Sequence, residues 1–197
     1  MKFLLGTKEY MTQIFREDGT VVPVTVLKTG PLTVTGKTGT NIQVGFGEKK
    51  SSRINKAQRG LSAGEGLGFA YLRSFQAGED LEVGSKIEVS TFAPGDKVTV
   101  SAISKGKGFQ GVVKRHDFKG GPRTHGQKHS EREAGSIGST GPQRVFKGVR
   151  MAGRMGGDRI TLKNLIIADV AAKEGRIYIK GAVPGRRGTL VEIRSVK

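Results

Sequence analysis

Short runs of β-branched and other apolar residues recur along the first half of the chain, separated by turn residues. The strands that we expect there cover residues 12–15, 21–27, 32–35, 42–46, 81–83, 87–89 and 98–103. Runs of this length between Gly-rich turns, such as the turn at residues 17–19, are typical of strands. Pro23 favours a sheet edge or a strand start, because proline has no N–H group to donate. Residues 55–63 are expected to form one short helix.

The strand pattern stops after residue 104 and returns after residue 157. Further strands are expected at residues 159–162, 165–170, 177–180 and 189–193. Many short strands spaced by turns favour a closed β-barrel over alternating strands and helices. We therefore expect residues 1–104 and 158–197 to form one mainly β, globular barrel domain. Residues 105–157 then form a long excursion from it.

The excursion has no apolar periodicity of its own. Apart from Val112 and Val113, its large apolar residues occur singly, so that no face could supply a core. Loops this long without secondary structure are usually functional or disordered. Phe, His, Gln and Met are placed irregularly among 13 glycines in this stretch, unlike the simple composition of a disordered segment. The pattern predicts an ordered extension that folds against an anionic partner.

Charge is distributed unevenly along the chain. The net charge is +17 and the pI is about 10.4, yet residues 1–104 carry 13 basic and 10 acidic side chains. The excess lies in the remainder, and its density favours nucleic-acid binding over an ordinary solvated basic surface. Cysteine is absent, which excludes disulfides and thiolate metal sites. No apolar run reaches the roughly 20 residues of a membrane span, and no signal peptide is evident. These features predict a cytoplasmic protein without a membrane partner.

The basic residues of the excursion are dispersed, which suits a strand threaded between phosphates. Phenylalanine and histidine rings among them could stack on bases. A flexible polybasic tail is the alternative, but a tail would not need scattered Phe and Met or strands beyond it. The candidate RNA-binding residues are Lys105, Lys107, Phe109, Lys114, Arg115, His116, Lys119, Arg123, His125, Lys128, His129, Arg132, Arg144, Lys147, Arg150 and Arg154.

One glycine pattern resembles a nucleotide site. Gly106, Gly108, Gly111 and Val113 match G-x-G-x-x-G-x-V, found in dinucleotide-binding turns and kinase phosphate loops. The helix that a dinucleotide site requires is not expected, since the chain runs into Phe-Lys-Gly-Gly-Pro, and no acidic residue lies about 20 positions on. No nucleotide cofactor is therefore expected. The same glycines would let backbone N–H groups approach an RNA backbone.

Metal binding and catalysis receive little support. His125 and His129 have the i, i+4 spacing of helical zinc ligands, but Gly126 and the missing periodicity argue against a helix. No Ser-His-Asp or Cys-His arrangement can be defended. Asp117 and Asp158 are explained as counter-charges to neighbouring cations. We expect no cofactor, no metal, no small-molecule substrate and no enzyme activity.

Three long motifs resemble the bacterial ribosomal protein L3 family of the large subunit. They are SKGKGFQGVVKRHDFKGGPRTHGQKHS at residues 104–130, GSIGSTGPQRVFKGVRMAGRMGG at 135–157 and KGAVPGRR at 180–187. The start resembles the family too, through MTQIF at 11–15 and PVTV at 23–26. The resemblance covers essentially the whole chain. It adds Arg186 and Arg187 to the candidate RNA-binding residues.

The resemblance implies a six-stranded translation-protein-type β-barrel with a long, mostly irregular basic extension. It implies binding to large-subunit ribosomal RNA, a part in early subunit assembly, an extension toward the peptidyl-transferase centre, and neighbouring ribosomal proteins as partners. Two positions depart from the family. Tyr10 replaces a usual glycine, and Gln143 does not align with a glutamine that is methylated in some members, so we do not carry that modification over.

Two other functions use the same features. A free-standing RNA chaperone or translation regulator would present the same basic surface. An RNA-modifying enzyme on a β-barrel would need a cofactor pocket and a nucleophile or acid–base pair, and the sequence offers neither. The leading prediction is a structural protein of the large ribosomal subunit.

Overall fold

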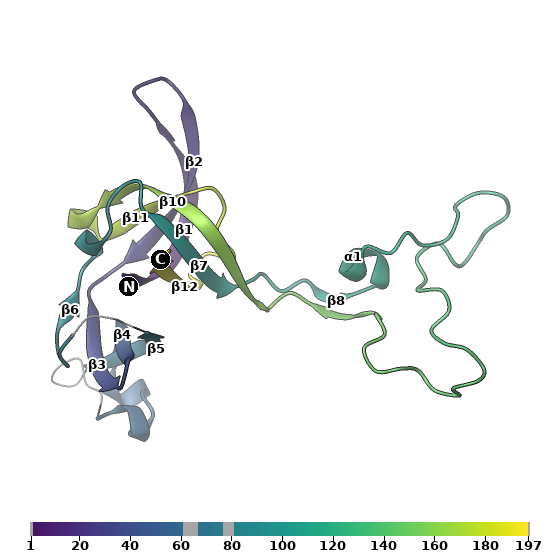
Figure 1. Ribbon diagram of the computed structural model, residues 1–197, viewed down its shortest axis with the longest axis horizontal. Coiled ribbons are helices and arrows are strands. Elements are labelled where there is room, and N and C mark those ends of the chain that lie inside the picture. Colours follow the sequence, from purple (N-terminus) through teal and green to yellow (C-terminus); the bar gives the residue numbers. More distant parts are fainter. Residues whose placement is uncertain (1, 61–66, 77–80, 197) are drawn as a thin grey trace. The chain divides into compact units, whose positions relative to one another are not determined.

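The computed structural model describes residues 2–60, 67–76 and 81–196 (Figure 1). The chain divides into two compact units. Unit 1 comprises Met1–Ile103 together with Arg159–Lys197, and unit 2 comprises Ser104–Asp158.

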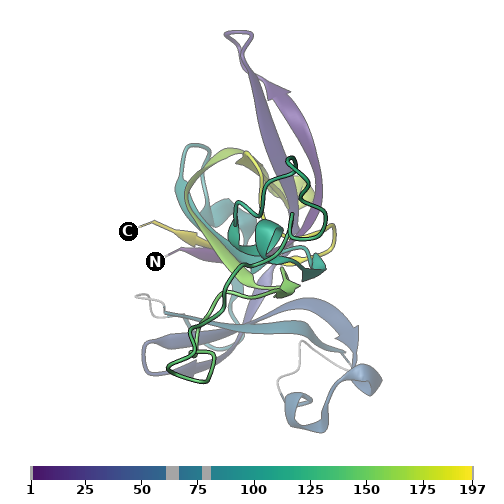
Figure 2. The same ribbon diagram turned by 90° about the vertical axis from the view of Figure 1, so that its right-hand side faces the viewer.

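Six strands of unit 1 form a closed ring, which is the topology of a barrel (Figures 1 and 2). Every neighbouring pair is antiparallel, and β2 pairs back with β1 to close the ring. The prediction of a mainly β fold is confirmed. In ring order the strands are β1 (Phe3–Phe15), β12 (Leu190–Ser195), β7 (Lys97–Ile103), β10 (Arg159–Ala171), β11 (Arg176–Lys180) and β2 (Val21–Thr29).

The core of unit 1 follows from the two-residue alternation of these strands. Val98, Val100 and Ala102 on β7 are buried in turn, because successive side chains of a strand point to opposite faces. Leu27 and Ile193 are fully buried in the same cluster. Full burial of one such side chain contributes about 1.5–3 kcal/mol, so the ring encloses its own source of stability.

A second sheet of unit 1 shares this core. Its strand order is β5 (Leu67–Gln76), β4 (Asn41–Lys50), β3 (Leu32–Thr38) and β6 (Lys86–Ile87). Phe75 of β5 stacks on Phe3 of β1, with ring centroids 4.5 Å apart. Gly45 lies beneath Phe69, where a Cβ atom would overlap the aromatic ring. Short 3-10 helices cover Ser51–Arg53, Lys56–Gln58, Val89–Thr91 and Ala172–Glu174.

Three predicted elements of unit 1 are wrong in whole or in part. Of the strand expected at residues 87–89, only Ile87 lies in a strand (β6), and Val89 begins a 3-10 helix. Residues 81–83 form no strand: Ser85 N–H donates to Glu82 O at 3.2 Å and Gly84 N–H to Val34 O at 2.8 Å, so this segment turns against β3. The described part of the helix expected at 55–63 contains only the 3-10 helix Lys56–Gln58; residues 61–63 lie outside the described residues. Strand β5 was not predicted, although the alternating aromatic residues Phe69, Tyr71 and Phe75 are a strand signal.

Unit 2 contains little regular structure. All of its residues are described, and its elements are β8 (Gly108–Gln110), α1 (Val112–His116) and β9 (Gly153–Met155). Between Asp117 and Ala152 none of these described residues lies in a helix or strand. Within residues 104–158, all of which are described, Val112 is the one buried hydrophobic side chain. Backbone pairing and turns, rather than a core, therefore hold unit 2 together.

Candidate nucleic-acid interface

A two-stranded ribbon joins the outgoing and returning chain of unit 2. Strands β8 and β9 pair antiparallel with Phe109 opposite Arg154, and Lys107 N–H donates to Met155 O at 2.9 Å. Next to the ribbon, Ser104 N–H donates to Asp158 O at 2.8 Å. Opposite residues of such a pair share one face, so the ribbon presents an exposed aromatic ring beside an exposed guanidinium.

Glycine lets the two arms approach closely at this ribbon. Gly156 has φ +75°, and a Cβ atom there would overlap the carbonyl oxygen of Lys105 and lie 3.1 Å from Gly106 Cα. Both features favour glycine, since other residues rarely adopt positive φ. The ribbon thus holds Lys105 and Lys107 of the outgoing arm near the returning chain.

Helix α1 follows directly, where the sequence predicted none. It starts after Gly111 and ends at Asp117, which has φ 58°. Five residues make one turn and a half, far shorter than the helix of a dinucleotide-binding unit. Residues 112–116 are helical because Val112 is buried and Arg115 N–H donates a hydrogen bond to Gly111 O at 3.0 Å.

Two predicted RNA-binding residues also hold the protein together. Arg115 Nη1 donates to Met151 O at 2.7 Å, and His116 Nε2 lies 3.1 Å from the same oxygen. The His116 ring is tilted against Phe118, with centroids 6.1 Å apart. Both side chains are half-buried. They connect the end of α1 to the returning arm and so position the cations on either side.

Residues 121–131 close on themselves as a loop. Gly121 N–H donates to Glu131 O at 3.1 Å, and Arg123 Nε forms an ion pair with Glu131 Oε1 at 2.6 Å. Gly120 packs on the same segment, since its Cβ would overlap Glu131 O. His125 has φ +61° at the turn, and His129 lies in irregular chain, so neither is on a helix.

The returning arm combines cations with exposed apolar groups. The Arg144 guanidinium lies over the Phe146 ring, 5.3 Å from its centroid, in a cation–π contact. Val145, Phe146 and Val149 are exposed, as are Lys147 and Arg150. This surface offers positive charge and a stacking plane together, which is the combination that single-stranded nucleic acid uses.

Most predicted binding side chains of unit 2 face outward. Within residues 104–158, all of them described, Arg123 is the cation that forms an ion pair, so most of the positive charge is uncompensated. Arg115 and His116 are the half-buried pair described above. The exposed residues are Lys105, Lys107, Phe109, Lys114, Lys119, Arg123, His125, Lys128, His129, Arg132, Arg144, Lys147, Arg150 and Arg154.

The other two candidates, Arg186 and Arg187, lie on a well-braced loop of unit 1. Lys8 Nζ donates to Val183 O at 2.6 Å and to Gly185 O at 3.2 Å. Thr189 closes the loop through its N–H to Arg186 O at 3.1 Å. Both arginines are exposed on this fixed backbone.

An arginine cluster in unit 1 was missed from the sequence. The carboxylate of Glu192, in a residue only 5% exposed, accepts hydrogen bonds from Arg73 Nε at 3.0 Å and Arg159 Nη1 at 2.9 Å. Arg194 Nη2 lies 3.7 Å away. The hydrogen bond to Glu192 raises the pKa of Arg159, since it favours the charged guanidinium. One carboxylate among three half-exposed guanidiniums leaves a positive surface. An acidic residue inside the apolar run Leu-Val-Glu-Ile was the available signal.

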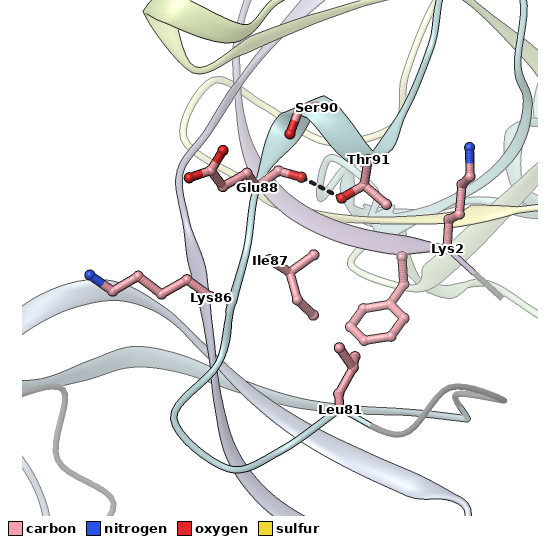
Figure 3. Close-up of a pocket in the computed structure, with 8 residues that line it drawn as sticks. Lys2, Leu81, Lys86, Ile87, Glu88, Ser90 and Thr91 are labelled. Carbon is pink, nitrogen blue, oxygen red and sulfur yellow. Dashed lines mark hydrogen bonds between the residues drawn. The ribbon is translucent and has the colours of Figure 1, made fainter.

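The hollow of unit 1 drawn in Figure 3 does not bring reactive groups together. In the pocket of Figure 3, Lys2 and Lys86 extend in different directions, and Thr91 Oγ1 donates to Glu88 O at 2.8 Å. A catalytic site needs groups that converge on one point. Among the described residues, no set of three or more His, Asp or Glu side chains is arranged to hold a metal ion. No helix in the described ranges is both long and apolar enough for a membrane crossing.

Comparison with known proteins gives a consistent result. The profile of the family described as Ribosomal protein L3 matches residues 49–176. The chain is 44% identical to the large ribosomal subunit protein uL3 of Acidothermus cellulolyticus, over 99% of this chain and 92% of that protein. It is also 44% identical to the large ribosomal subunit protein uL3 of Chlorobium limicola, over 100% of both chains.

Proposed function

Because this chain belongs to the ribosomal protein L3 family, we propose that it is a structural constituent of the large ribosomal subunit in the cytoplasm and binds large-subunit ribosomal RNA directly through unit 2. Both relatives carry the name large ribosomal subunit protein uL3. The single observation that carries the binding proposal is the make-up of unit 2. It buries one large apolar side chain, Val112, yet exposes uncompensated cations along its length.

A segment with so little core needs an external partner to order its side chains. Phe109 is 77% exposed, and Phe146 is half exposed under Arg144. An aromatic ring exposed to water makes no stabilising contact, whereas stacking of the ring on a base contributes about 1–3 kcal/mol to the binding free energy. The exposed lysines and arginines then neutralise phosphates and release counterions. RNA supplies both kinds of contact.

The backbone geometry supports recognition by shape. Gly120, His125 and Gly148 have positive φ and interrupt any regular strand or helix, so the cations are presented along a turning chain. Contacts of this kind position a protein on the sugar–phosphate backbone without reading base sequence. Arg186, Arg187 and the cluster around Glu192 extend the same chemistry to unit 1.

The family implies the finer features of the proposal. The six-stranded ring is a translation-protein-type barrel, and residues 105–157 are its RNA-binding extension, directed toward the peptidyl-transferase centre. The protein acts early in subunit assembly and contacts neighbouring ribosomal proteins. The closed ring order and the basic, mostly irregular unit 2 support this assignment.

The proposal is tested with a charge-neutral variant of the full chain. Arg144, Lys147 and Arg150 are each replaced by Gln, and Lys49, Lys50 and Lys173 are replaced in a control of equal charge change. Affinity for large-subunit ribosomal RNA is measured at several salt concentrations. The first variant should bind more weakly. Its plot of log affinity against log salt should also be less steep, by about 2 in slope, because each lost phosphate contact removes roughly 0.7–0.9. Equal effects of the two variants would overturn the proposal.

Co-sedimentation separates this function from a free-standing RNA chaperone or translation regulator. A constituent of the subunit follows large subunits in one-to-one ratio and stays bound at moderate salt. A protein found mainly in the ribosome-free fraction would support the regulator instead.

A further inference from the structure

The hairpin formed by β1 and β2 continues beyond the ring. The register of β1 with β12 ends at Thr7, whereas Met11–Phe15 pairs with β2 alone among the described residues. Figures 1 and 2 both show these two strands extending away from the rest of unit 1. The outer edge of β1 is thus unpaired over its last five residues. Open strand edges are usually covered or protected in native proteins.

One face of this extended hairpin is apolar and exposed. Cross-strand pairing places Met11, Gln13 and Phe15 on the same face as Pro23 and Val21, since residues on a strand alternate. Met11 is 50% exposed, Phe15 66% and Val21 47%. We call Met11, Phe15, Val21 and Pro23 the hairpin patch.

The opposite face of the same strands is covered. Val22 is 4% exposed and Val24 is fully buried, and Ile14 is half-buried. The two faces therefore differ although both are rich in apolar residues. The hairpin patch is a sheet face without a partner in the described part of the chain.

Charge indicates which kind of partner fits the patch. Residues 10–25 contain one of the 34 Lys and Arg residues of the chain, Arg16, and two carboxylates, Glu17 and Asp18. Thr20 N–H donates to Asp18 Oδ1 at 2.8 Å, and this hydrogen bond lowers the pKa of Asp18. Together Arg16, Glu17 and Asp18 give the turn one net negative charge. In a chain of net charge +17, this segment is therefore poor in the cations that phosphate binding requires.

We propose that the hairpin patch docks a basic protein with an apolar contact surface, namely a neighbouring protein of the large subunit. The inference rests on the proposed function for the identity of that partner. Phe15 and Met11 form the apolar centre, and Glu17 with Asp18 forms an acidic rim that attracts a basic partner. A second copy of this chain fits less well, because two chains of charge +17 repel each other.

Two substitutions of the same residue distinguish a protein partner from RNA. Both Phe15→Glu and Phe15→Lys remove the apolar centre, so both should weaken docking of a protein by about thirtyfold, the loss that a hot-spot residue gives. On an RNA-binding surface Phe15→Lys would bind as well as the natural chain or better, and only Phe15→Glu would bind more weakly. Val83→Glu is the control, because Val83 is exposed to a similar extent (63%) and lies outside the hairpin.

The measurement uses the full chain assembled into large subunits, with a photo-crosslinking amino acid in place of Gln13. The expected product is a crosslink to another large-subunit protein, lost with both Phe15 variants and kept with Val83→Glu. A crosslink to RNA, a crosslink to a second copy, or no crosslink at all would overturn the proposal.

RNA affinity of each variant, measured on the isolated protein, shows whether unit 2 still binds. It should stay unchanged, because the cations of unit 2 are untouched. Failure of the RNA-binding proposal would appear in the Arg144, Lys147 and Arg150 variant, whereas failure of the docking proposal appears in the crosslink alone.

Discussion

Arg159 Nη1 donates a hydrogen bond of 2.9 Å to Oε1 of Glu192, although the two residues lie on strands β10 and β12, which do not pair with each other. Strand β7 lies between them and pairs with both. Arg73, from the second sheet, donates to the same carboxylate at 3.0 Å. The buried carboxylate of Glu192 therefore connects two strands of the ring to the second sheet. One of its partners, Arg159, is the residue at which the chain enters unit 1 again.

Replacing Glu192 by Gln should destabilise unit 1. The amide keeps the shape but removes the negative charge that balances the guanidiniums of Arg73 and Arg159. Because those guanidiniums are about half exposed, we expect a loss of about 1–3 kcal/mol in the free energy of unfolding, less than for a fully buried pair. Urea unfolding measures it. Glu174→Gln, which affects an exposed pair with Arg176, should change the free energy of unfolding much less than Glu192→Gln does. Equal losses would contradict this account.

Replacing Gly156 by Ala should disturb the ribbon of unit 2. The new Cβ would overlap Lys105 O, and the residue has φ +75°. Gly126 has φ +79° but open space around it, so Gly126→Ala carries similar backbone strain without the overlap. Gly156→Ala should therefore increase proteolytic cleavage within residues 105–157 and lower RNA affinity more than the control does. If both variants behave alike, the close approach of the two arms has no consequence.

Lys8→Met should loosen the loop that carries Arg186 and Arg187. The ammonium donates to the carbonyls of Val183 and Gly185, and removing it leaves these acceptors short of a partner. We expect a loss of about 1–3 kcal/mol in stability and faster amide exchange in residues 181–189. Lys2→Met, which removes a more exposed ion pair with Asp96, is the matched control. Unchanged exchange in the loop would show that Lys8 does not brace it.

Asp18 should titrate at lower pH in the folded chain than in the unfolded one. The backbone N–H of Thr20 and its side chain lower the pKa of this carboxyl below its ordinary value of 3.8. A lowered folded pKa means that its contribution to the turn is complete above about pH 4 and is lost as the pH falls through the folded value. Carboxyl NMR titration with and without 8 M urea measures both midpoints. Identical midpoints would exclude the hydrogen bond as a stabilising contact.

Local pattern was sufficient for most strands and for the character of unit 2. Alternating apolar residues at 98–103 and 177–180 predicted parts of β7 and β11, and the absence of such a pattern predicted that residues 117–152 have no core. The strand predicted at residues 81–83 was wrong because Gly84 and Ser85 form hydrogen bonds with β3, and no local sequence pattern reveals such contacts. The short helix α1 was not predicted either, since five residues are too few to show a helical periodicity.

The candidate site divides in the same way. Composition alone identified the cations and the aromatic rings, and the structure leaves most of them exposed; their contacts with RNA remain predictions. The bonds of Arg115 and His116 to Met151 were not predictable, because they join residues about 35 positions apart. Neither was the cluster around Glu192, whose members come from three distant segments.

The sequence by itself determined the family, the mainly β class and the segment that carries excess charge, because each depends on residue types and short spacings. Tertiary structure decided how the ring closes, which cations brace the protein, and which apolar residues stay exposed. Pairing of β1 with β12 and burial of Glu192 depend on chain segments more than a hundred residues apart. Only the folded chain brings these segments together. Only in the folded chain are the apolar residues of the hairpin patch exposed while those of the core are buried.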